Sequence, residues 1–313
     1  MSPYVESVRL ESGSRGQTVS ECRKPRSSGR RMALLRRAGL FGADTKGAVI
    51  TRAATVDDLV SAYRLVHDAF VEKGYVNPLP SGMRVRVFEA LPETATFVAK
   101  VGDRVVGVQG LAVDSPEFGL PSDESFKDEI DALRLDGRVV CEATNQAIAP
   151  EFRNSAVPTE LMRCMFAHAL AIGCDELITT ISPGHVRFFE LLGFEQISPV
   201  RSYSKKVEDF VVVMRVNVSD LLERTAQADE DSDDALLFIK CRCVAGNPYR
   251  EQVANWAGEA AKTFEDPAAL RRLLVDESHF LDQCSSGELE SLAGRWGDAV
   301  FAQVHPEALV LSP

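Results

Sequence analysis

Features that would place this 313-residue protein in several common classes are absent or scarce. No stretch reaches the roughly 18 apolar residues that a membrane span needs, and no apolar segment precedes residue 30 as a secretory signal would require. The cysteine count is odd, at seven, and the close pair Cys241 and Cys243 has no second pair at zinc-ligand spacing. We therefore expect a cytoplasmic protein with reduced thiols and no metal site.

Charge is distributed unevenly along the chain. The net charge is +6 over residues 1–50, −7 over 51–217 and −10 over 218–313. The basic first segment is rich in Ser, Gly and Arg and shows no periodicity, so we predict a disordered arm over 1–45. Such an arm is most often simply solvated, although it is also suited to an acidic partner.

The remainder divides at an acidic run, 229–234, which is typical of a linker. We predict a main domain over 46–218 and a helical C-terminal extension over 219–313. Alternation predicts strands at 48–53, 94–100, 104–113, 139–148, 177–181 and within 200–218. Helical spacing predicts helices after a capping box at Thr55 and at 126–135, 159–172 and about 185–192. This order indicates a mixed α/β sheet flanked by helices rather than a strict βαβ winding.

The strand at 139–148 is apolar apart from a few polar residues, of which Glu142 is the only acid. A buried carboxylate is costly unless it has a partner or a catalytic task. With the two-residue period of a strand, Glu142 and Thr144 are expected on one face and Asn145 on the other. A purely structural role remains open, in which Glu142 pairs with Arg84, Arg104 or Arg187.

Short motifs spread over the main domain carry a resemblance to a known enzyme family. They lie at 63–75, 114–116, 119–123, 129–134, 142–144, 185–189 and 192–194, with weaker similarity at 280–285 and 292–297. Through them, residues 47–217 resemble the GNAT-like acyltransferases. The similarity is closest to the long-chain N-acyl amino acid synthases and more distant to the acyl-homoserine-lactone autoinducer synthases. It implies a GNAT-like, mostly antiparallel sheet flanked by helices.

The resemblance implies a bacterial, cytoplasmic enzyme that moves a long-chain fatty acyl group to the α-amine of an amino acid. CoA-dependent relatives hold pyrophosphate at a Gly-rich turn, but the turn at 153–158 has no Gly and contains Pro158. This favours acyl carrier protein over acyl-CoA as donor, with the acyl group as a phosphopantetheine thioester. We expect no permanently bound cofactor and no nucleic-acid partner, but peripheral membrane contact through the lipid product. The basic candidates for carrier docking are Arg201, Lys205, Lys206 and the N-terminal arm.

The candidate site residues follow from the resemblance and from their chemistry. Glu142 would act as base, directly or through water, and a backbone N–H at a bulge of its strand would hold the oxyanion. Arg84 or Arg64 would bind the acceptor carboxylate and Arg153 the donor phosphate. The catalytic candidates are Glu142, Thr144 and His185. The substrate-binding candidates are Arg84, Arg64, Asp114, Asn145, Arg153, Arg187, Phe188 and Phe189, and Phe97, Val108 and Leu111 are further candidates for an acyl slot.

Two other functions remain open. An acyl-homoserine-lactone synthase is disfavoured because Asn145 stands where those enzymes usually carry an Arg. A non-catalytic module that binds acyl carrier protein or lipid is supported by the Gly-free turn. It is also supported by Phe189, which stands where many superfamily members carry a Tyr that protonates the leaving thiolate.

Overall fold

The computed structural model describes residues 42, 44–134, 137–204, 207–229, 232, 234–253, 255–256, 264 and 266–306. The predicted arm over 1–45 lies almost entirely outside the described residues, as do Lys205 and Lys206. Among the described helices, none is long and apolar enough to cross a membrane. The division into three segments stays a prediction.

Eight strands of the described chain form one sheet, in the order β1-β2-β3-β4-β5-β8-β6, with β7 paired to β8. All pairs are antiparallel except β4 with β5, which are parallel. The predicted mixed, mostly antiparallel sheet is therefore confirmed. The strands are β1 (Val49–Arg52), β2 (Ala95–Val101), β3 (Arg104–Val113), β4 (Val140–Ile148), β5 (Glu176–Ile181), β6 (Glu195–Gln196), β7 (Arg201–Ser204) and β8 (Val207–Asn217).

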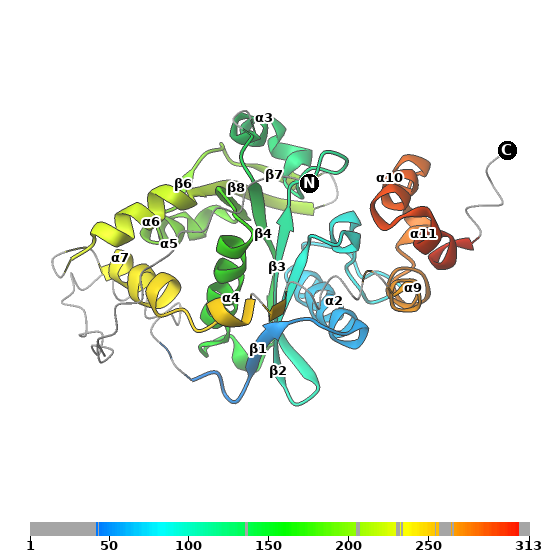
Figure 1. The fold of residues 1–313 in the computed structure, drawn as a ribbon, viewed down its shortest axis with the longest axis horizontal. Coiled ribbons are helices and arrows are strands. Elements are labelled where there is room, and N and C mark those ends of the chain that lie inside the picture. Colours follow the sequence, from blue (N-terminus) through cyan, green and yellow to red (C-terminus); the bar gives the residue numbers. More distant parts are fainter. Residues whose placement is uncertain are drawn as a thin grey trace.

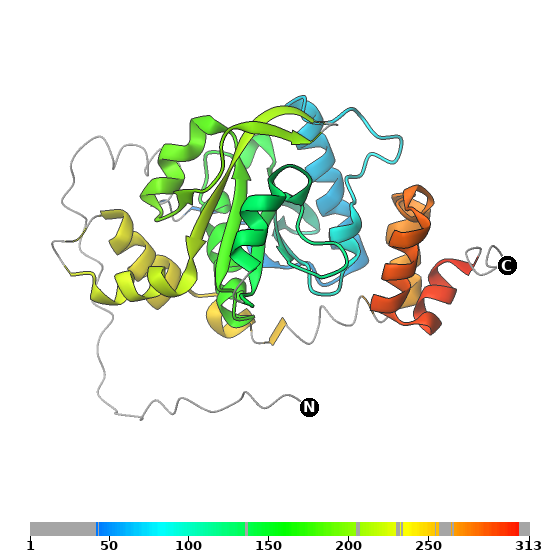
Figure 2. The same ribbon diagram turned by 90° about the horizontal axis from the view of Figure 1, so that it is seen from above.

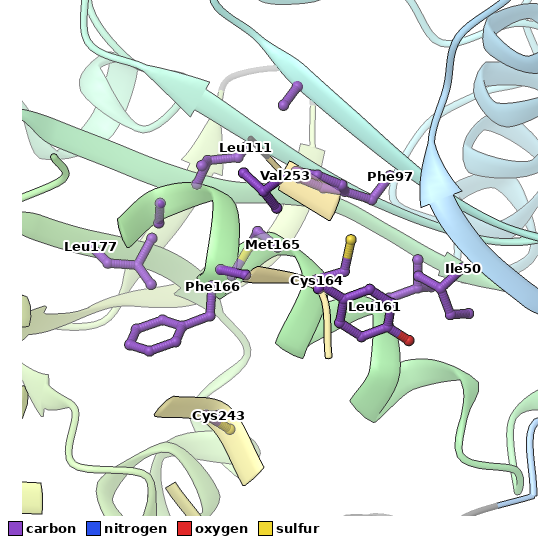
Figure 3. Packing of buried hydrophobic residues seen from close by; sticks show 14 of the residues in the cluster. Ile50, Phe97, Leu111, Leu161, Cys164, Met165, Phe166, Leu177, Cys243 and Val253 are labelled. Carbon is purple, nitrogen blue, oxygen red and sulfur yellow. The ribbon is translucent and has the colours of Figure 1, made fainter. Parts of the chain in front are cut away.

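Two helices cover opposite faces of the sheet, α2 (Val56–Glu72) and α4 (Val157–Ala171) (Figure 1). The α2 helix begins at the predicted cap, because the Thr55 side chain accepts a hydrogen bond from Asp58 N at 3.2 Å. On the other face, α4 buries Leu161, Cys164 and Met165 against the sheet in the main core cluster, part of which is drawn in Figure 3. The two faces therefore have separate apolar cores.

The remaining elements of the main domain surround these layers. The predicted 126–135 helix is α3 (Asp123–Arg134), which begins earlier and is kinked at Phe126. The predicted 185–192 helix is a 3-10 turn, η3 (Pro183–His185), followed by α5 (Val186–Leu191). Two further 3-10 turns are η1 (Val87–Ala90) and η2 (Pro150–Phe152).

The C-terminal extension reaches both sides of the sheet (Figures 1 and 2). Its first part lies on the side of α4 and consists of α6 (Val218–Gln227), α7 (Asp234–Phe238) and a π-helical segment, η4 (Ile239–Ala245). Its second part packs against α2 and contains α9 (Pro267–Arg271), η5 (Arg272–Glu277), η6 (Leu281–Gln283), α10 (Ser286–Trp296) and α11 (Asp298–Val304).

Candidate active site

The parallel strands β4 and β5 separate halfway along their length. Their pairing ends at Ala143 with Thr179, after which β4 continues with β3 and β5 continues with β8. The opening between them is lined by residues 143–146 of β4, by residues 179–181 of β5 and by Ser182 after it, and all of these border one cavity. The separation therefore creates a gap in the sheet next to Glu142.

A bulge in β4 changes the direction of the side chains at this gap. Between the pairs Gly110–Thr144 and Val108–Ala147, β4 has one residue more than β3. Asn145 has a left-handed φ of 53° there. A methyl group on Gly110 would lie 3.1 Å from Thr144 Cγ2, a tight contact, so glycine at this position favours the close approach of the two strands. The predicted bulge is thus present.

The bulge overturns the predicted alternation of Thr144 and Asn145. The side chains of both residues accept a hydrogen bond from Arg86 Nη2, at 3.2 Å to Thr144 Oγ1 and 3.3 Å to Asn145 Oδ1. They therefore point to the same guanidinium instead of to opposite faces. The physical reason is the extra residue, which shifts the two-residue period of the strand.

Glu142 is 1% exposed and lies on the wall of the cavity. Its carboxylate accepts hydrogen bonds from the backbone N–H of Ser122 at 3.0 Å and from the Ser122 hydroxyl at 2.6 Å. The Thr180 hydroxyl contacts both Ser122 Oγ and Glu142 Oε1 and also borders the cavity. Burial raises the pKa of Glu142 from 4.5 to about 7, although the hydrogen bonds from Ser122 act in the opposite direction.

The proposed pairing of Glu142 with one of three arginines is wrong. Arg84 donates to Asn145, Arg104 pairs with Glu151 and Arg187 pairs with Glu190. The carboxylate is instead held by hydroxyl and backbone donors, which carry no full charge. This leaves Glu142 with a pKa in the range that a general base needs near neutral pH.

A buried polar cluster lies beside this carboxylate. Arg84 Nη1 donates to Asn145 Oδ1 at 2.9 Å, Asn145 Nδ2 donates to Glu89 Oε1 at 2.8 Å, and Arg86 Nη2 donates to the same Glu89 oxygen at 2.6 Å. Burial acts to raise the pKa of Glu89, but the charges of Arg86 and Arg84 together with the hydrogen bonds from Arg86 outweigh it, so this pKa lies below 4.5. The three ionised side chains of this cluster therefore carry one net positive charge.

Arg84 supplies the cation of this cluster that borders the cavity. Its guanidinium also stacks on Phe70, 4.7 Å from the ring centroid. Burial lowers the pKa of Arg84 to about 10, which leaves it charged near neutral pH. A buried guanidinium facing a cavity is suited to bind a carboxylate through parallel hydrogen bonds.

The cavity has a volume of about 760 Å³, within the range of about 300–1,000 Å³ that is usual for small-molecule sites. It has a polar and an apolar part. The polar part is bordered by Arg84, Gln109, Glu142, Thr144, Asn145, Gln146, Thr180, Tyr203 and Asp209. The apolar part is bordered by Met162, Met165, Phe166, Leu177, Phe188, Phe189, Leu192, Phe194, Leu221, Ile239 and Cys243. Such a cavity can hold a polar acceptor and a long apolar chain together.

The structure brings most of the predicted site residues to this cavity. Those that border it are Glu142, Thr144, His185, Arg84, Asn145, Arg153, Arg187, Phe188 and Phe189. His185, Arg153 and Arg187 are exposed and therefore lie at its rim. Their roles stay predictions.

Five predicted residues lie elsewhere. Arg64 Nη2 pairs with Glu277 Oε2 at 2.7 Å, and Asp114 accepts two hydrogen bonds from Arg134, each at 2.7 Å. The three residues Phe97, Val108 and Leu111 are buried in the core and do not border the cavity. Alternation identified these three as buried, but it does not distinguish a core position from the wall of a cavity.

The structure also adds residues that the sequence did not single out. Arg86, Glu89, Ser122 and Tyr203 orient or accompany the predicted groups, and the Tyr203 hydroxyl lies 3.5 Å from Arg86 Nη1. The local signal for Arg86 and Glu89 is their three-residue spacing, which forms a cap for η1. Ser122 and Tyr203 carry no comparable signal, since their contacts are made across 20 and 117 residues.

The start of α4 has few free backbone donors. Ala156 N donates to Asp44 O at 2.9 Å, Val157 N donates to Ser155 Oγ at 3.2 Å, and Pro158 has no N–H. Pyrophosphate at a helix N-terminus is held by several such donors. This turn is therefore poorly suited to a pyrophosphate.

The gap between two parallel strands of a mostly antiparallel sheet, with a buried carboxyl beside a polar and apolar cavity, defines the class of this protein as a GNAT-like acyltransferase. A family model described as N-acyl amino acid synthase FeeM matches residues 61–217, which is half of the chain. The protein belongs to this family.

The chain is also similar to several solved structures. The structure of FeeM, an N-acyl amino acid synthase from uncultured soil microbes, is 24% identical, covers 55% of this chain and 92% of its own, and has a TM-score of 0.49. BjaI, a CoA-dependent acyl-homoserine lactone synthase, is 21% identical over 61% of this chain and 97% of its own, with a TM-score of 0.40. The AHL synthase LasI is 16% identical over 54% and 88%, with a TM-score of 0.42. No curated protein matched the sequence.

Proposed function

We propose that this acyltransferase moves a long-chain fatty acyl group from acyl carrier protein to the α-amine of an amino acid. The observation that carries the proposal is the position of Glu142, which borders the same cavity as the buried Arg84 and an extensive apolar wall. The family to which the chain belongs supports N-acylation as the reaction. The cavity supports the two substrates, because its polar part suits the acceptor and its apolar part suits the acyl chain.

The acceptor would bind in the polar part of the cavity. Arg84 would bind its carboxylate, because the cluster of Arg84, Arg86 and Glu89 has one uncompensated positive charge beside the cavity. With its carboxylate bound there, the acceptor would present its α-amine to Glu142, which borders the same cavity. The amine must be neutral to attack, and a carboxyl with a pKa of about 7 is suited to take its proton, directly or through a water molecule.

The bulge of β4 would assist the transfer of the acyl group. The amine nitrogen attacks the thioester carbonyl carbon, the C–N bond forms, and the oxygen becomes an oxyanion. We assign the stabilisation of that oxyanion to the backbone at the bulge, where Asn145 and Gln146 leave the ladder with β3 and border the cavity. Collapse breaks the C–S bond and the phosphopantetheine thiolate leaves, while the nitrogen loses one proton to become the amide and the thiolate takes up one proton to become the thiol. No Tyr is needed at Phe189, because a thiolate is a good leaving group.

The turn before α4 supports a carrier protein as donor. The N–H groups of Ala156 and Val157 already donate hydrogen bonds within the protein, and Pro158 has no N–H. The turn therefore suits a single phosphate better than a pyrophosphate. An acidic carrier would meet cations at the rim of the cavity, namely Lys73, Arg153 and Arg187, of which Arg153 also pairs with Glu72 and Arg187 with Glu190. Of the candidates named from the sequence, Arg201 does not border the cavity.

Expression of the full chain in a bacterium tests the proposal. Lipid extracts are expected to contain N-acyl amino acids with the protein and to lose them with Glu142→Gln. With purified protein, the same acyl group on acyl carrier protein is expected to react at least an order of magnitude faster than on CoA. Identical lipid extracts from cells with and without the folded protein would contradict the proposal. Capture of acyl carrier protein without turnover would identify a binding module instead.

A further inference from the structure

The apolar end of the cavity is completed by the C-terminal extension. Ile239 and Cys243 of η4 border it together with Leu221 of α6, and all three belong to the core cluster that contains Phe166 and Leu192. All five residues are buried. Phe166, Leu177 and Cys243 of this cluster are labelled in Figure 3. All three extension residues lie beyond the matched region 61–217.

A buried ion pair on α4 holds η4 in this place. Arg163 Nη1 donates to both carboxylate oxygens of Glu160, at 2.6 and 2.8 Å, and the side chains are only 5% and 10% exposed. Arg163 also donates to two carbonyl oxygens of the extension, to Arg242 O from Nε and to Gly246 O from Nη2, each at 2.9 Å. The π-helical segment is therefore fixed to α4 by charge-assisted hydrogen bonds.

Two further residues of the extension form hydrogen bonds with Glu160 and Arg163. The Tyr249 hydroxyl donates to Glu160 Oε2 at 3.0 Å, and Asn247 Nδ2 donates to Arg163 O at 2.9 Å. A buried charge pair with its other bonding positions filled has one favoured geometry. The position of η4 relative to the cavity is thereby well defined.

The chemistry of this end is apolar throughout. Burial raises the pKa of Cys243 to about 12, so the thiol stays protonated and behaves as a small apolar group. Ile239 and Leu221 add branched aliphatic surface next to it. The end of the cavity therefore offers contact to methylene and methyl groups and no group that reacts with them.

We propose that η4 is the end wall of the acyl site, and that Ile239 and Cys243 set the longest acyl chain that the enzyme accepts. This inference rests on the proposed function, because it takes the apolar part of the cavity as the acyl site. Each buried methylene contributes about fourfold to binding. A wall moved by the length of two methylenes therefore changes the relative preference between two chain lengths by about an order of magnitude.

Binding of fatty acids to the full-length protein tests this independently of turnover. A series from octanoate to stearate is measured by thermal stabilisation for the wild type, Cys243→Phe and Ile239→Ala. We expect the preferred length to become shorter with Cys243→Phe, which fills the end, and longer with Ile239→Ala, which enlarges it. Val253→Ala is the matched control, since Val253 is 1% exposed in the same core cluster but does not border the cavity.

Turnover separates this inference from the proposed function. Chain lengths of N-acyl amino acids in lipid extracts should shift in the same directions as the binding preference. If no such lipids form but the fatty-acid preference moves as expected, the wall assignment stands and the proposed reaction fails. The wall assignment is overturned if the preferred length is unchanged in both variants or if it shifts equally with Val253→Ala. It is also overturned if no fatty acid of the series binds.

Discussion

The indole N–H of Trp296 donates a hydrogen bond to the carbonyl oxygen of Ala90 at 2.9 Å, across 206 residues of sequence. Ala90 ends η1, the turn that contains Glu89 and follows Arg86. The helix α10 of the extension therefore supports the segment that carries the polar cluster of the site. The same extension thus contacts the cavity region at two places, through η4 at the apolar end and through α10 behind the polar end.

Loss of this hydrogen bond should reduce stability. Trp296→Phe keeps an aromatic ring but leaves the Ala90 carbonyl without its donor, so we expect a decrease of about 1–3 kcal/mol in the free energy of unfolding. Denaturant unfolding measures it. Gln303→Ala on the exposed side of α11 is the control and should change stability by less than about 0.5 kcal/mol. Equal stability of Trp296→Phe and wild type would show that α10 does not brace η1.

Replacement of the candidate base should remove activity and keep the fold. Glu142→Gln retains a side-chain oxygen that can accept from Ser122 but has no basic carboxylate, so we expect kcat to fall by about 10²–10⁴-fold. Steady-state kinetics with a saturating acyl donor measures it. Glu129→Gln on α3, outside the cavity, is the control. Full activity in Glu142→Gln would exclude Glu142 as the base.

The pH dependence of stability should report the buried Glu142 carboxyl. Its folded pKa of about 7 lies above the ordinary 4.5, so between these values the folded state binds more protons than the unfolded state. Its contribution to stability is therefore fully present below about 4.5 and is lost as the pH rises to about 7. At 1.36 kcal/mol per pH unit, the loss is about 3 kcal/mol.

The comparison with Glu142→Gln isolates this effect from other titrating groups. Unfolding free energies of both proteins are measured from pH 4 to pH 8, and their difference should move in favour of the variant by about 3 kcal/mol. The rate of acyl transfer should rise over the same upper range, because only the ionised carboxyl accepts a proton. A constant difference between the two proteins would mean that the pKa of Glu142 is not raised.

Two arginines proposed from the sequence for the acceptor carboxylate should now behave differently. Arg84→Lys keeps the charge but loses the planar fork, so KM for the amino acid should rise about tenfold or more, while KM for the acyl donor stays the same. Arg64→Lys is the matched control, because Arg64 is half exposed and pairs with Glu277 away from the cavity. Equal effects of the two substitutions would contradict the assignment of Arg84.

Local pattern accounts for much of the fold. The sequence predicted the helix cap at Thr55, the apolar strand around Glu142 and the strands β2 and β3, because side-chain period and capping chemistry act over a few neighbouring residues. The family motifs added the GNAT-like, mostly antiparallel arrangement of the sheet. The same local information correctly marked Glu142 as an acid in a buried strand.

Contacts between distant segments decided the rest. A single extra residue in β4 turned Asn145 toward Arg86, which no fixed two-residue period predicts. Ser122 contacts Glu142 because α3 begins beside β4. Arg64 lies outside the site because η5 packs on α2 and its Glu277 pairs with Arg64. The amino-acid sequence by itself determined the elements, the family and the acid at the centre. Tertiary packing determined which side chains meet that acid and which part of the extension closes the cavity, because these contacts depend on segments far apart in the chain.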